Sequence, residues 1–253
     1  MEGNNENNFI EVSAGNLKKK YSISAFFPVY NDWGTISGMV LLVNSVLEKY
    51  AAEYEIILVD DGSRHLTKLV LEQLGKKIDK LRIITHEKNR GYGGALKSGF
   101  YNAKYDLVFY TDGDAQYNPQ ELSLLIEKFS DEVDVVNGYK ISRSDPVYRK
   151  ILGRIYHHIT KMLFGFEIRD VDCDFRLIRR SIFDDLKLNY NSGVICVEMI
   201  ARMTKRGCRF AEVPVHHYYR VSGKSEFFNF KRVFNVIKNL VRLWYRVRIK
   251  NIY

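Results

Sequence analysis

The stretch DLVFYTDGDAQYNP, from Asp106 to Pro119, is an apolar run that ends abruptly on acidic residues. The letters LVFY predict a buried strand, and such strands are typical of parallel sheets covered by helices on both faces. Asp112 and Asp114 follow the run with one glycine between them. Because alternate residues of an extended chain point to the same side and glycine lets the backbone bend, we expect both carboxylates to face one point.

Strand and helix patterns alternate through the rest of the first half of the chain. We expect strands over YSISAFFPV, YEIILVDD, LRIIT, DLVFYTD and VDVVNGY, and helices over 35–49, 67–78, the segment GGALKSGFYNA and the residues after Asn118-Pro119. Short apolar strands separated by helices predict an α/β fold with a mostly parallel sheet between helices.

Three of the predicted strands end in polar clusters, PVYND, VDDGS and TDGDAQ. Ligands of such sheets bind beyond the carboxyl ends of the strands. A helix cap explains any one acidic strand end, but three on one rim favour a binding site. Asp112, Asp114 and Gln116 offer the hard oxygen ligands that suit Mg²⁺ or Mn²⁺, usually shared with substrate phosphates. A surface turn with solvated acids is the alternative for this spacing.

Composition and charge indicate a globular protein of the cytosol that does not bind nucleic acid. Its 253 residues are 46% apolar, no run of 18 apolar residues occurs, and the leader MEGNNENNF lacks the layout of a signal peptide. The three cysteines have no metal-ligand spacing and are expected to be reduced, packed thiols. Of the 39 basic residues seven lie in 227–253, which leaves 32 against 30 acidic ones in a nearly neutral body.

The glycine-rich segment NRGYGGALKSG, residues 89–99, leads into a predicted helix. It does not match the dinucleotide fingerprint, because Leu96 stands where the third glycine belongs, and it lacks the GK[ST] of a P-loop. A helix N-terminus with Arg90 and Lys97 nearby can nevertheless hold an anion. A tight turn before a packed helix is the alternative.

Six motifs follow one another along the chain: FFPVYND, VDDGS, NRGYGGALKSG, TDGDAQYNP, DCDFRLIRR and YYRVSGKS. In content and order they resemble the motifs of family-2 glycosyltransferases of the GT-A fold. Over roughly residues 22–228 the chain most resembles the polyprenyl-phosphate branch, which includes the dolichyl-phosphate mannose and glucose synthases. The resemblance implies a flexible leader at 1–20, a Rossmann-like GT-A domain at 21–228 and an amphipathic helix at 229–253.

For the donor, the resemblance implies that the first strand end, the DDGS turn and the RVSGKS loop bind a nucleotide sugar. The matching positions are Pro28, Tyr30, Asp32, Asp60, Asp61, Arg220 and Lys224. Asp32 stands where the family usually has glutamate, which is one methylene longer. TDGDAQ corresponds to the metal motif of the family, with Asp114 and Gln116 as ligands and Asp112 orienting the donor or the metal.

For the acceptor, the basic segment YKISRSDPVYRKILGR supplies cations. A phosphate acceptor is already an anion and needs positioning more than it needs a general base. By resemblance, Arg143 and Arg149 bind this phosphate; a solvated basic helix face is the alternative. In DCDFRLIRR, Asp172 or Asp174 is a candidate base for a hydroxyl acceptor. Arg176 is either a further candidate there or a structural ion-pair partner.

The C-terminal segment has the pattern of a basic amphipathic helix. The apolar stripe comprises Phe230, Val233, Phe234, Ile237, Leu240, Val241 and Trp244, and Lys231, Lys238, Arg242 and Arg246 lie off it. The pattern is typical of a helix on an anionic membrane surface, and a helix docked on its own sheet or on a twin subunit is the alternative. No membrane-spanning segment follows, so we expect a peripheral protein or one with a separate membrane partner.

The leading hypothesis is therefore a metal-dependent, inverting transfer from a GDP- or UDP-sugar to a polyprenyl phosphate, at the inner face of the membrane. Transfer to a saccharide hydroxyl of a cell-surface polysaccharide is the second reading. A catalytically silent scaffold of the same fold is the third, and the intact TDGDAQ and RVSGKS motifs argue against it.

Overall fold

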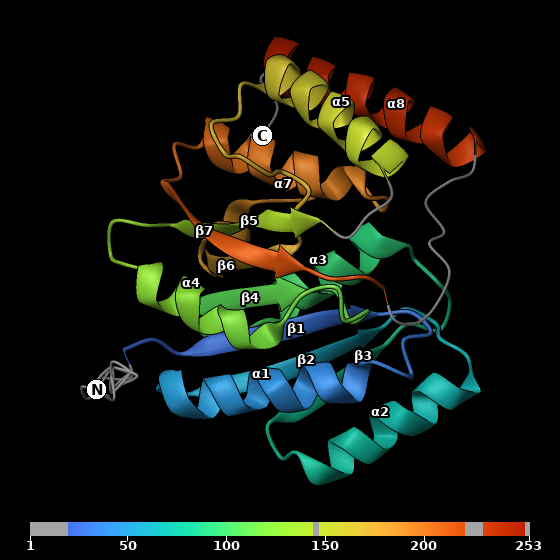
Figure 1. Cartoon of the computed structure of the whole chain (residues 1–253), viewed down its shortest axis with the longest axis vertical. Coiled ribbons are helices and arrows are strands. Elements are labelled where there is room, and N and C mark those ends of the chain that lie inside the picture. Colours follow the sequence, from blue (N-terminus) through green and yellow to red (C-terminus); the bar gives the residue numbers. More distant parts are fainter. Residues whose placement is uncertain (1–19, 144–146, 221–229, 251–253) are drawn as a thin grey trace, which may run out of the picture.

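A single sheet organises the chain, of which the computed structural model describes residues 20–143, 147–220 and 230–250 (Figure 1). The strands are β1 (Ile23–Val29), β2 (Tyr54–Asp60), β3 (Leu81–Thr85), β4 (Leu107–Thr111), β5 (Val135–Arg143), β6 (Phe175–Arg179) and β7 (Phe210–His217). The helices are α1 (Ile36–Tyr50), α2 (His65–Lys77), α3 (Tyr92–Asn102), α4 (Leu122–Lys128), α5 (Val147–Phe164), α6 (Ile182–Asp185), α7 (Val194–Lys205) and α8 (Phe230–Trp244). Two short turns of helix, η1 (Pro119–Glu121) and η2 (Tyr245–Ile249), precede α4 and follow α8.

The seven strands are ordered β3-β2-β1-β4-β6-β5-β7. β1 pairs in parallel with β2 and β4, β2 with β3, and β5 with β7. β6 runs antiparallel to both of its neighbours, β4 and β5. The predicted α/β fold with a mostly parallel sheet between helices is confirmed, and β6 adds an antiparallel strand that the sequence patterns did not reveal.

Alternate residues of β1 face two different layers of helices. Phe27 belongs to the apolar cluster that includes α1 and α4, whereas Phe26 packs on Phe100 of α3 with ring centroids 4.9 Å apart. Both phenylalanines are fully buried. A Cβ at Gly99 of α3 would run into the Phe26 ring, so glycine lets this helix approach the sheet closely. Burial on both faces explains why the strands are continuously apolar.

A second layer of helices lies on the outer side of α7, where α5 and α8 run next to each other (Figure 1). α8 and η2 bury Leu240, Leu243 and Val247 in a cluster shared with α7 and the end of α5. The predicted stripe included Leu240 but not Leu243. Its members Ile237 and Val241 remain 55% and 57% exposed. One face of the helix is therefore docked on this domain, and another faces solvent.

The strand directions bring the polar motifs to one edge of the sheet. β1, β2 and β4 end there, with Val29 of β1 paired to Asp60 of β2. Because β6 is antiparallel, its first residue, Phe175, lies opposite the end of β4. β5 and β7 also end at this edge, with Arg143 beside His217. The segments that precede β6 and follow β7 therefore meet the turns after β1, β2 and β4.

Candidate active site

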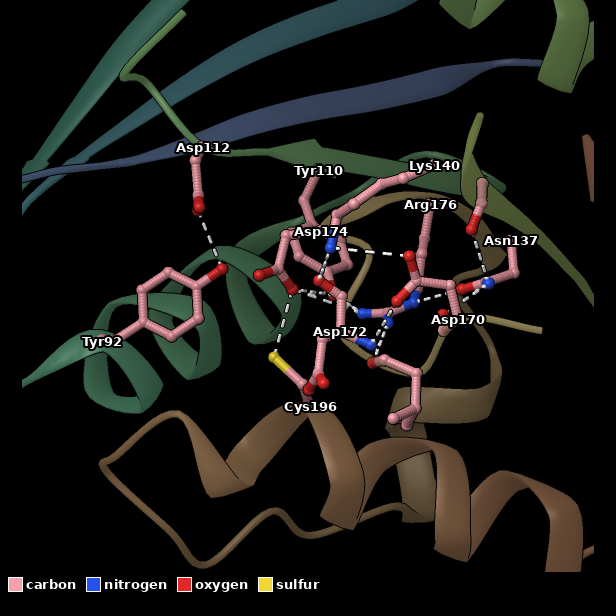
Figure 2. Close-up of polar contacts among 12 residues, drawn as sticks. Tyr92, Tyr110, Asp112, Asn137, Lys140, Asp170, Asp172, Asp174, Arg176 and Cys196 are labelled. Carbon is pink, nitrogen blue, oxygen red and sulfur yellow. Dashed lines mark hydrogen bonds and ion pairs between the residues drawn. The ribbon is translucent and has the colours of Figure 1, made fainter. Parts of the chain in front are cut away.

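Asp112, directly after β4, is held by a tyrosine from a neighbouring helix (Figure 2). Its Oδ1 accepts a hydrogen bond of 2.8 Å from the hydroxyl of Tyr92, the first residue of α3. Burial, then the charges of Asp174 and Asp114, raise the pKa of Asp112 well above its ordinary range. Burial, then the charge of Asp112, also raise the pKa of Tyr92, so the hydroxyl stays protonated and donates.

Asp114 is buried and lies against an arginine from a distant part of the chain. Its Oδ2 accepts a hydrogen bond from Arg220, which follows β7, and its Oδ1 accepts one of 3.1 Å from the backbone N–H of Gln116. Ala115 between them has φ 61°, a left-handed conformation that is strained for a residue with a side chain. The side-chain amide of Gln116 donates to the carbonyl of Tyr218 at 3.3 Å, which ties the turn after β4 to the end of β7.

Asp32, in the turn after β1, is the third carboxylate at this edge. Its Oδ2 accepts the backbone N–H of Tyr30 at 2.9 Å. Burial raises the pKa of Asp32 to about 6; the Tyr30 N–H opposes this rise and the charge of Asp114 adds to it. The Thr35 hydroxyl donates to the carbonyl of Gly113 at 2.6 Å, so the turn after β1 is bonded directly to the turn after β4.

The three carboxylates Asp32, Asp112 and Asp114 suit a hard divalent cation that is shared with a ligand. Burial raises the pKa of all three, and the charge of Asp114 adds to the rise at Asp32, as that of Asp174 does at Asp112 and Asp114. Such repulsion is relieved when a cation neutralises the group. Within the described residues, no three acidic, histidine or cysteine side chains form a closed metal site. That arrangement fits Mg²⁺ or Mn²⁺, which usually take several ligands from water and substrate phosphates.

The two aspartates of the VDDGS turn are buried and bonded within the chain. Asp60 accepts a backbone N–H of its own turn at 2.8 Å. Asp61 lies 2.7 Å from Nδ1 of His86 and accepts the backbone N–H groups of Arg90 and Gly91 at 2.8 and 2.9 Å. Asp61 therefore holds the start of the glycine-rich segment beside the end of β2.

The N-terminus of α3 is occupied by the chain itself. The N–H of Gly93 donates to the carbonyl of Asn191 at 2.9 Å, and Lys97 donates to the side-chain oxygen of Asn191 at 2.5 Å. Gly91, the residue before the helix, has φ 82°. These contacts correspond to the alternative for this segment, a tight turn before a packed helix. Arg90 keeps an exposed side chain near the site, whereas Lys97 serves the contact with the 189–193 loop.

The loop before β6 is held from the sheet by three side chains (Figure 2). Lys140 donates to the carbonyl of Asp172 at 2.8 Å, and Asn137 and Arg176 donate to the two carbonyls before it. Arg176 is completely buried and also contacts Asn137. Its role is therefore structural, which was the alternative to a role in binding the acceptor. Lys140 likewise supports this loop and is not a solvated cation of the basic segment.

The two aspartates carried by this loop have different surroundings. Asp174 lies 3.2 Å from the Tyr110 hydroxyl, 3.4 Å from Arg176 and 3.1 Å from the Cys196 thiol (Figure 2). Within the described part of the chain, no hydrogen bond reaches the Asp172 carboxylate. Burial raises the pKa of Asp172 to about 7. Asp174 is therefore an anchored group, and Asp172 is the acid that remains available for a ligand.

Three residues of this site were missed by the motif analysis. Tyr92 stands inside the glycine-rich motif, where its glycines were the recognised signal. Tyr110 is an interior residue of β4, and its alternation with Asp112 along the strand was the available signal. Cys196 was expected to be a packed, reduced thiol; it is buried and free, but only the fold brings it to Asp174.

The structure gathers most of the predicted residues at this edge and leaves some side chains undescribed. Those gathered are Pro28, Tyr30, Asp32, Asp60, Asp61, Asp112, Asp114, Gln116, Asp172, Asp174 and Arg220. The backbone places Arg143 at the end of β5 and Arg149 in the first turn of α5, but their side chains lie outside the description. The same holds for the side chains of Phe230, Lys231, Val233 and Phe234, and Lys224 lies wholly outside the described residues.

Comparison with known proteins shows the family and the fold of this chain. The family model described as Glycosyl transferase family 2 matches residues 24–187, from β1 through α6. Glucosyl-3-phosphoglycerate synthase from Mycobacterium tuberculosis, solved with phosphoglyceric acid, matches with a TM-score of 0.70 at 14% identity, over 90% of this chain and 80% of that chain. Its complex with Mn²⁺, UDP and glucosyl-3-phosphoglycerate (TM-score 0.69, 14% identity) and its complex with Mg²⁺ and UDP (0.70, 15%) match over the same shares of both chains. The structural likeness shows a common GT-A fold, and the family match shows that the chain belongs to glycosyl transferase family 2.

Proposed function

We propose that this protein transfers a sugar, with inversion, from a GDP- or UDP-sugar to a polyprenyl phosphate at a membrane surface. The proposal rests on one observation: Asp32, Asp112 and Asp114 converge at the carboxyl edge of the sheet, next to Arg220. Carboxylates there suit a nucleotide diphosphate held through a divalent cation. A catalytically silent scaffold has no need of such a costly cluster of buried acids.

Asp112 and Asp114 would hold the Mg²⁺ or Mn²⁺ ion, with Gln116 as a further oxygen ligand. When bound, the cation offsets the charge of the diphosphate and makes it a better leaving group. The synthase from M. tuberculosis was solved with UDP together with Mn²⁺ or Mg²⁺, which supports the same pairing of donor and ion in this family member. Arg220 lies on Asp114 and is placed to meet the departing diphosphate, as the resemblance implies for it and for Lys224.

The transfer itself is a single displacement. An oxygen of the acceptor phosphate attacks the anomeric carbon from the side opposite the diphosphate, the bond from that carbon to the diphosphate breaks, and the configuration inverts. Since the attacking phosphate is already ionised, no group has to take its proton. The protein has to hold the two anions in line, which is the task of fixed cations on either side of the sugar.

Arg143 and Arg149 are the cations that we assign to the acceptor phosphate. β5 ends at Arg143 on the same edge as the carboxylates, and α5 begins at Val147, so Arg149 stands in its first turn. Both positions lie across the sheet from the VDDGS turn, because β5 and β2 are separated by three strands. This separation supports a donor pocket on one side and an acceptor pocket on the other.

A surface made by α5 and α8 supports contact with a membrane, and we place this contact on the cytoplasmic face. Exposed apolar side chains follow one another along both helices: Ile155, Ile159 and Met162 on α5, and Ile237, Val241 and Tyr245 on α8 and η2. The exposed cations Lys238, Arg242, Arg248 and Lys250 accompany them. Basic residues at a membrane contribute about 1 kcal/mol each through attraction to anionic lipids. Among the described residues, no helix is long and apolar enough to cross a bilayer.

A hydroxyl acceptor is the second candidate, and Asp172 is the observation that favours it. Its carboxylate is partly buried, receives no hydrogen bond from the described residues and has its pKa raised to about 7 by burial. A base with a pKa near the working pH suits removal of a hydroxyl proton. The structurally similar synthase is named for glucosyl-3-phosphoglycerate, a product that also carries a phosphate.

A transfer assay with a panel of donors and three acceptors tests the proposal. The full chain is incubated with Mn²⁺ and labelled GDP- or UDP-hexoses, together with a short polyprenyl phosphate, 3-phosphoglycerate or a neutral disaccharide. We expect the label to move to the polyprenyl phosphate and the reaction to stop in chelator. Transfer to phosphoglycerate or to the disaccharide alone supports the hydroxyl acceptor, and no turnover of any donor contradicts both.

A further inference from the structure

The glycine-rich segment 89–99 has no direct role in the function proposed above, yet it places one side chain in the site. Tyr92, at the first position of α3, points its hydroxyl at Asp112 (Figure 2). The 2.8 Å hydrogen bond occupies Oδ1 of that carboxylate. Asp112 stands in the turn that follows the strand, so the bond connects it to a separate helix.

Two clamps hold the turn that carries Tyr92. On the sheet side, the Asp61 carboxylate accepts the backbone N–H groups of Arg90 and Gly91. On the opposite side, the carbonyl of Asn191 accepts the N–H of Gly93 at 2.9 Å. The residues directly before and after Tyr92 are therefore both fixed by hydrogen bonds.

The clamp at Asn191 leaves no room for side chains next to Tyr92. A Cβ at Gly91 would lie 2.6 Å from the carbonyl oxygen of Asn191, and one at Gly93 would lie 2.9 Å from its Cα. Real Cβ atoms do not approach backbone atoms so closely. Gly91 and Gly93 let the turn before α3 touch the loop at Asn191. Tyr92 is the residue between these two glycines.

The 189–191 loop that forms this clamp is itself anchored in the core. Glu198 of α7 is fully buried and accepts the N–H groups of Asn189 and Tyr190 at 2.8 and 3.1 Å. Its charge is balanced by Arg202 one turn further along the helix. The backbone on both sides of Tyr92 is therefore held by contacts that reach from the sheet to α7.

We propose that Tyr92 is a positioning residue, whose hydroxyl sets the rotation of the Asp112 carboxylate so that Oδ2 faces the donor site. This inference rests on the proposed function, in which Asp112 holds the cation or orients the donor. A carboxylate rotates freely about its last bond unless a partner fixes it. A tilt of this group would misplace the diphosphate relative to the acceptor, and transfer rates are sensitive to small misplacements.

A purely structural role for Tyr92 makes a different prediction. The residue is partly buried and packs against the apolar cluster of α3 and α7. If the ring alone matters, phenylalanine would replace it without effect on turnover. The hydroxyl and its hydrogen bond to Asp112 are what separate the two readings.

The experiment compares Tyr92→Phe with Tyr101→Phe in the full chain. Tyr101 lies on the same helix, and its hydroxyl bridges Leu186 and Leu188 at 3.0 and 2.8 Å, away from the site. We expect kcat of Tyr92→Phe to fall by about ten-fold or more, as for the loss of a partner that orients a metal-binding carboxylate. KM for the acceptor should stay within about two-fold, and Tyr101→Phe should keep wild-type kcat while losing at least as much thermal stability.

A double-mutant cycle with Asp112→Asn shows whether the effect passes through the carboxylate. Mn²⁺-dependent binding of UDP and of GDP is measured by calorimetry in the four proteins, so the cycle closes even where turnover is too slow to follow. We expect Tyr92→Phe to weaken this binding in the wild-type background and to add nothing in Asp112→Asn.

The outcomes separate this inference from the function on which it rests. Unchanged kcat in an otherwise active Tyr92→Phe protein, or an equal loss in both backgrounds, overturns the positioning role and leaves the proposed function standing. A wild-type protein that binds neither nucleotide with Mn²⁺ and turns over no nucleotide sugar overturns both.

Discussion

Individual carboxylates at the carboxyl edge of the sheet are held in unfavourable surroundings. Asp32, Asp112 and Asp114 are partly or wholly buried, and their charges repel one another. Arg220 stabilises the charge of Asp114 through a direct ion pair, and its charge also opposes the rise in the pKa of Asp32. Clusters of acids with raised pKa values are typical of functional sites, because a packed core gains nothing from them.

Asp114→Asn tests the role of this cluster with little change in volume. Turnover should fall by about two orders of magnitude or more, in line with the loss of ~3 kcal/mol of charge stabilisation. The assay follows transfer at saturating Mn²⁺. Asp131→Asn removes an exposed acid that pairs with Lys20 and is the matched control, expected to behave as wild type. Full activity of Asp114→Asn in chelator would refute the metal role.

Asp172→Asn should remove a pH dependence of stability. Burial raises the pKa of Asp172 from 3.8 to about 7, so the folded state holds a proton that the unfolded state has lost. The free energy of unfolding of the wild type, relative to that of the variant, should be highest below pH 4 and should fall as the pH rises to about 7. The total change is on the order of 2 to 4 kcal/mol. Urea unfolding at pH 4.5, 6 and 8 measures it, and a constant difference between the proteins would contradict it.

At the scale of elements, the junction of α3 with the 189–193 loop depends on glycine. A Cβ at Gly93 would meet the backbone of Asn191, whereas one at Gly38, which is exposed in the first turn of α1, meets nothing within 4 Å. Gly93→Ala should cost about 1–3 kcal/mol of stability, because a backbone has to move. Gly38→Ala should add roughly 0.5–1 kcal/mol, the helix propensity difference. Thermal unfolding compares the two variants. An unchanged melting temperature of Gly93→Ala would show that the loop at Asn191 can move to accommodate the added methyl group.

The junction of β5 and α5 is the element assigned to the acceptor. Arg149→Ala should raise KM for the acceptor by roughly ten-fold or more, as for a lost charge-assisted hydrogen bond. Calorimetry should find nucleotide affinity unchanged, since three strands separate β5 from β2. Lys161→Ala, near the far end of the same helix, is the control for the loss of one positive charge away from the site. Lost nucleotide binding in Arg149→Ala would move this residue to the donor site.

For the whole molecule, the question is whether the face of α5 and α8 meets a membrane. The full chain should sediment with vesicles of phosphatidylcholine and phosphatidylserine, and added salt should weaken this binding because the attraction is screened. The double variant Ile237→Glu with Val241→Glu should stay in the supernatant at an unchanged melting temperature, since both side chains are more than half exposed. Leu41→Glu, exposed on α1, is the matched control and should sediment as wild type.

Two further results complete this test. Leu243→Ala should lower stability by about 2–5 kcal/mol, because Leu243 is fully buried in the cluster between α7 and α8. Loss of stability there, with vesicle binding retained, separates the docked face of α8 from its exposed face. Wild-type protein that ignores anionic vesicles at low salt would contradict the membrane location.

The local patterns of the chain were sufficient for the fold class and for the rim of the sheet. Continuous apolar runs in β1, β2 and β4 predicted strands covered on both faces, because a strand can be apolar throughout only where no face meets water. The acids that follow these strands could be placed on one edge, since parallel strands all end on the same side. β6 escaped prediction because its direction depends on its partners and not on its own residues.

The bonding of each side chain was decided by tertiary structure alone. No spacing in the sequence could tell that Asp61 holds the backbone of a distant turn, that Cys196 reaches Asp174, or that Tyr92 fixes Asp112. The apolar stripe of α8 was visible, yet only its contact with α7 determined that Leu243 is buried and Ile237 is exposed. Periodicity shows which residues share a face of a helix or strand. The hydrogen-bond partner of a buried side chain depends instead on how elements that are far apart in the chain pack, because a polar group is buried at low cost only where packing supplies a partner.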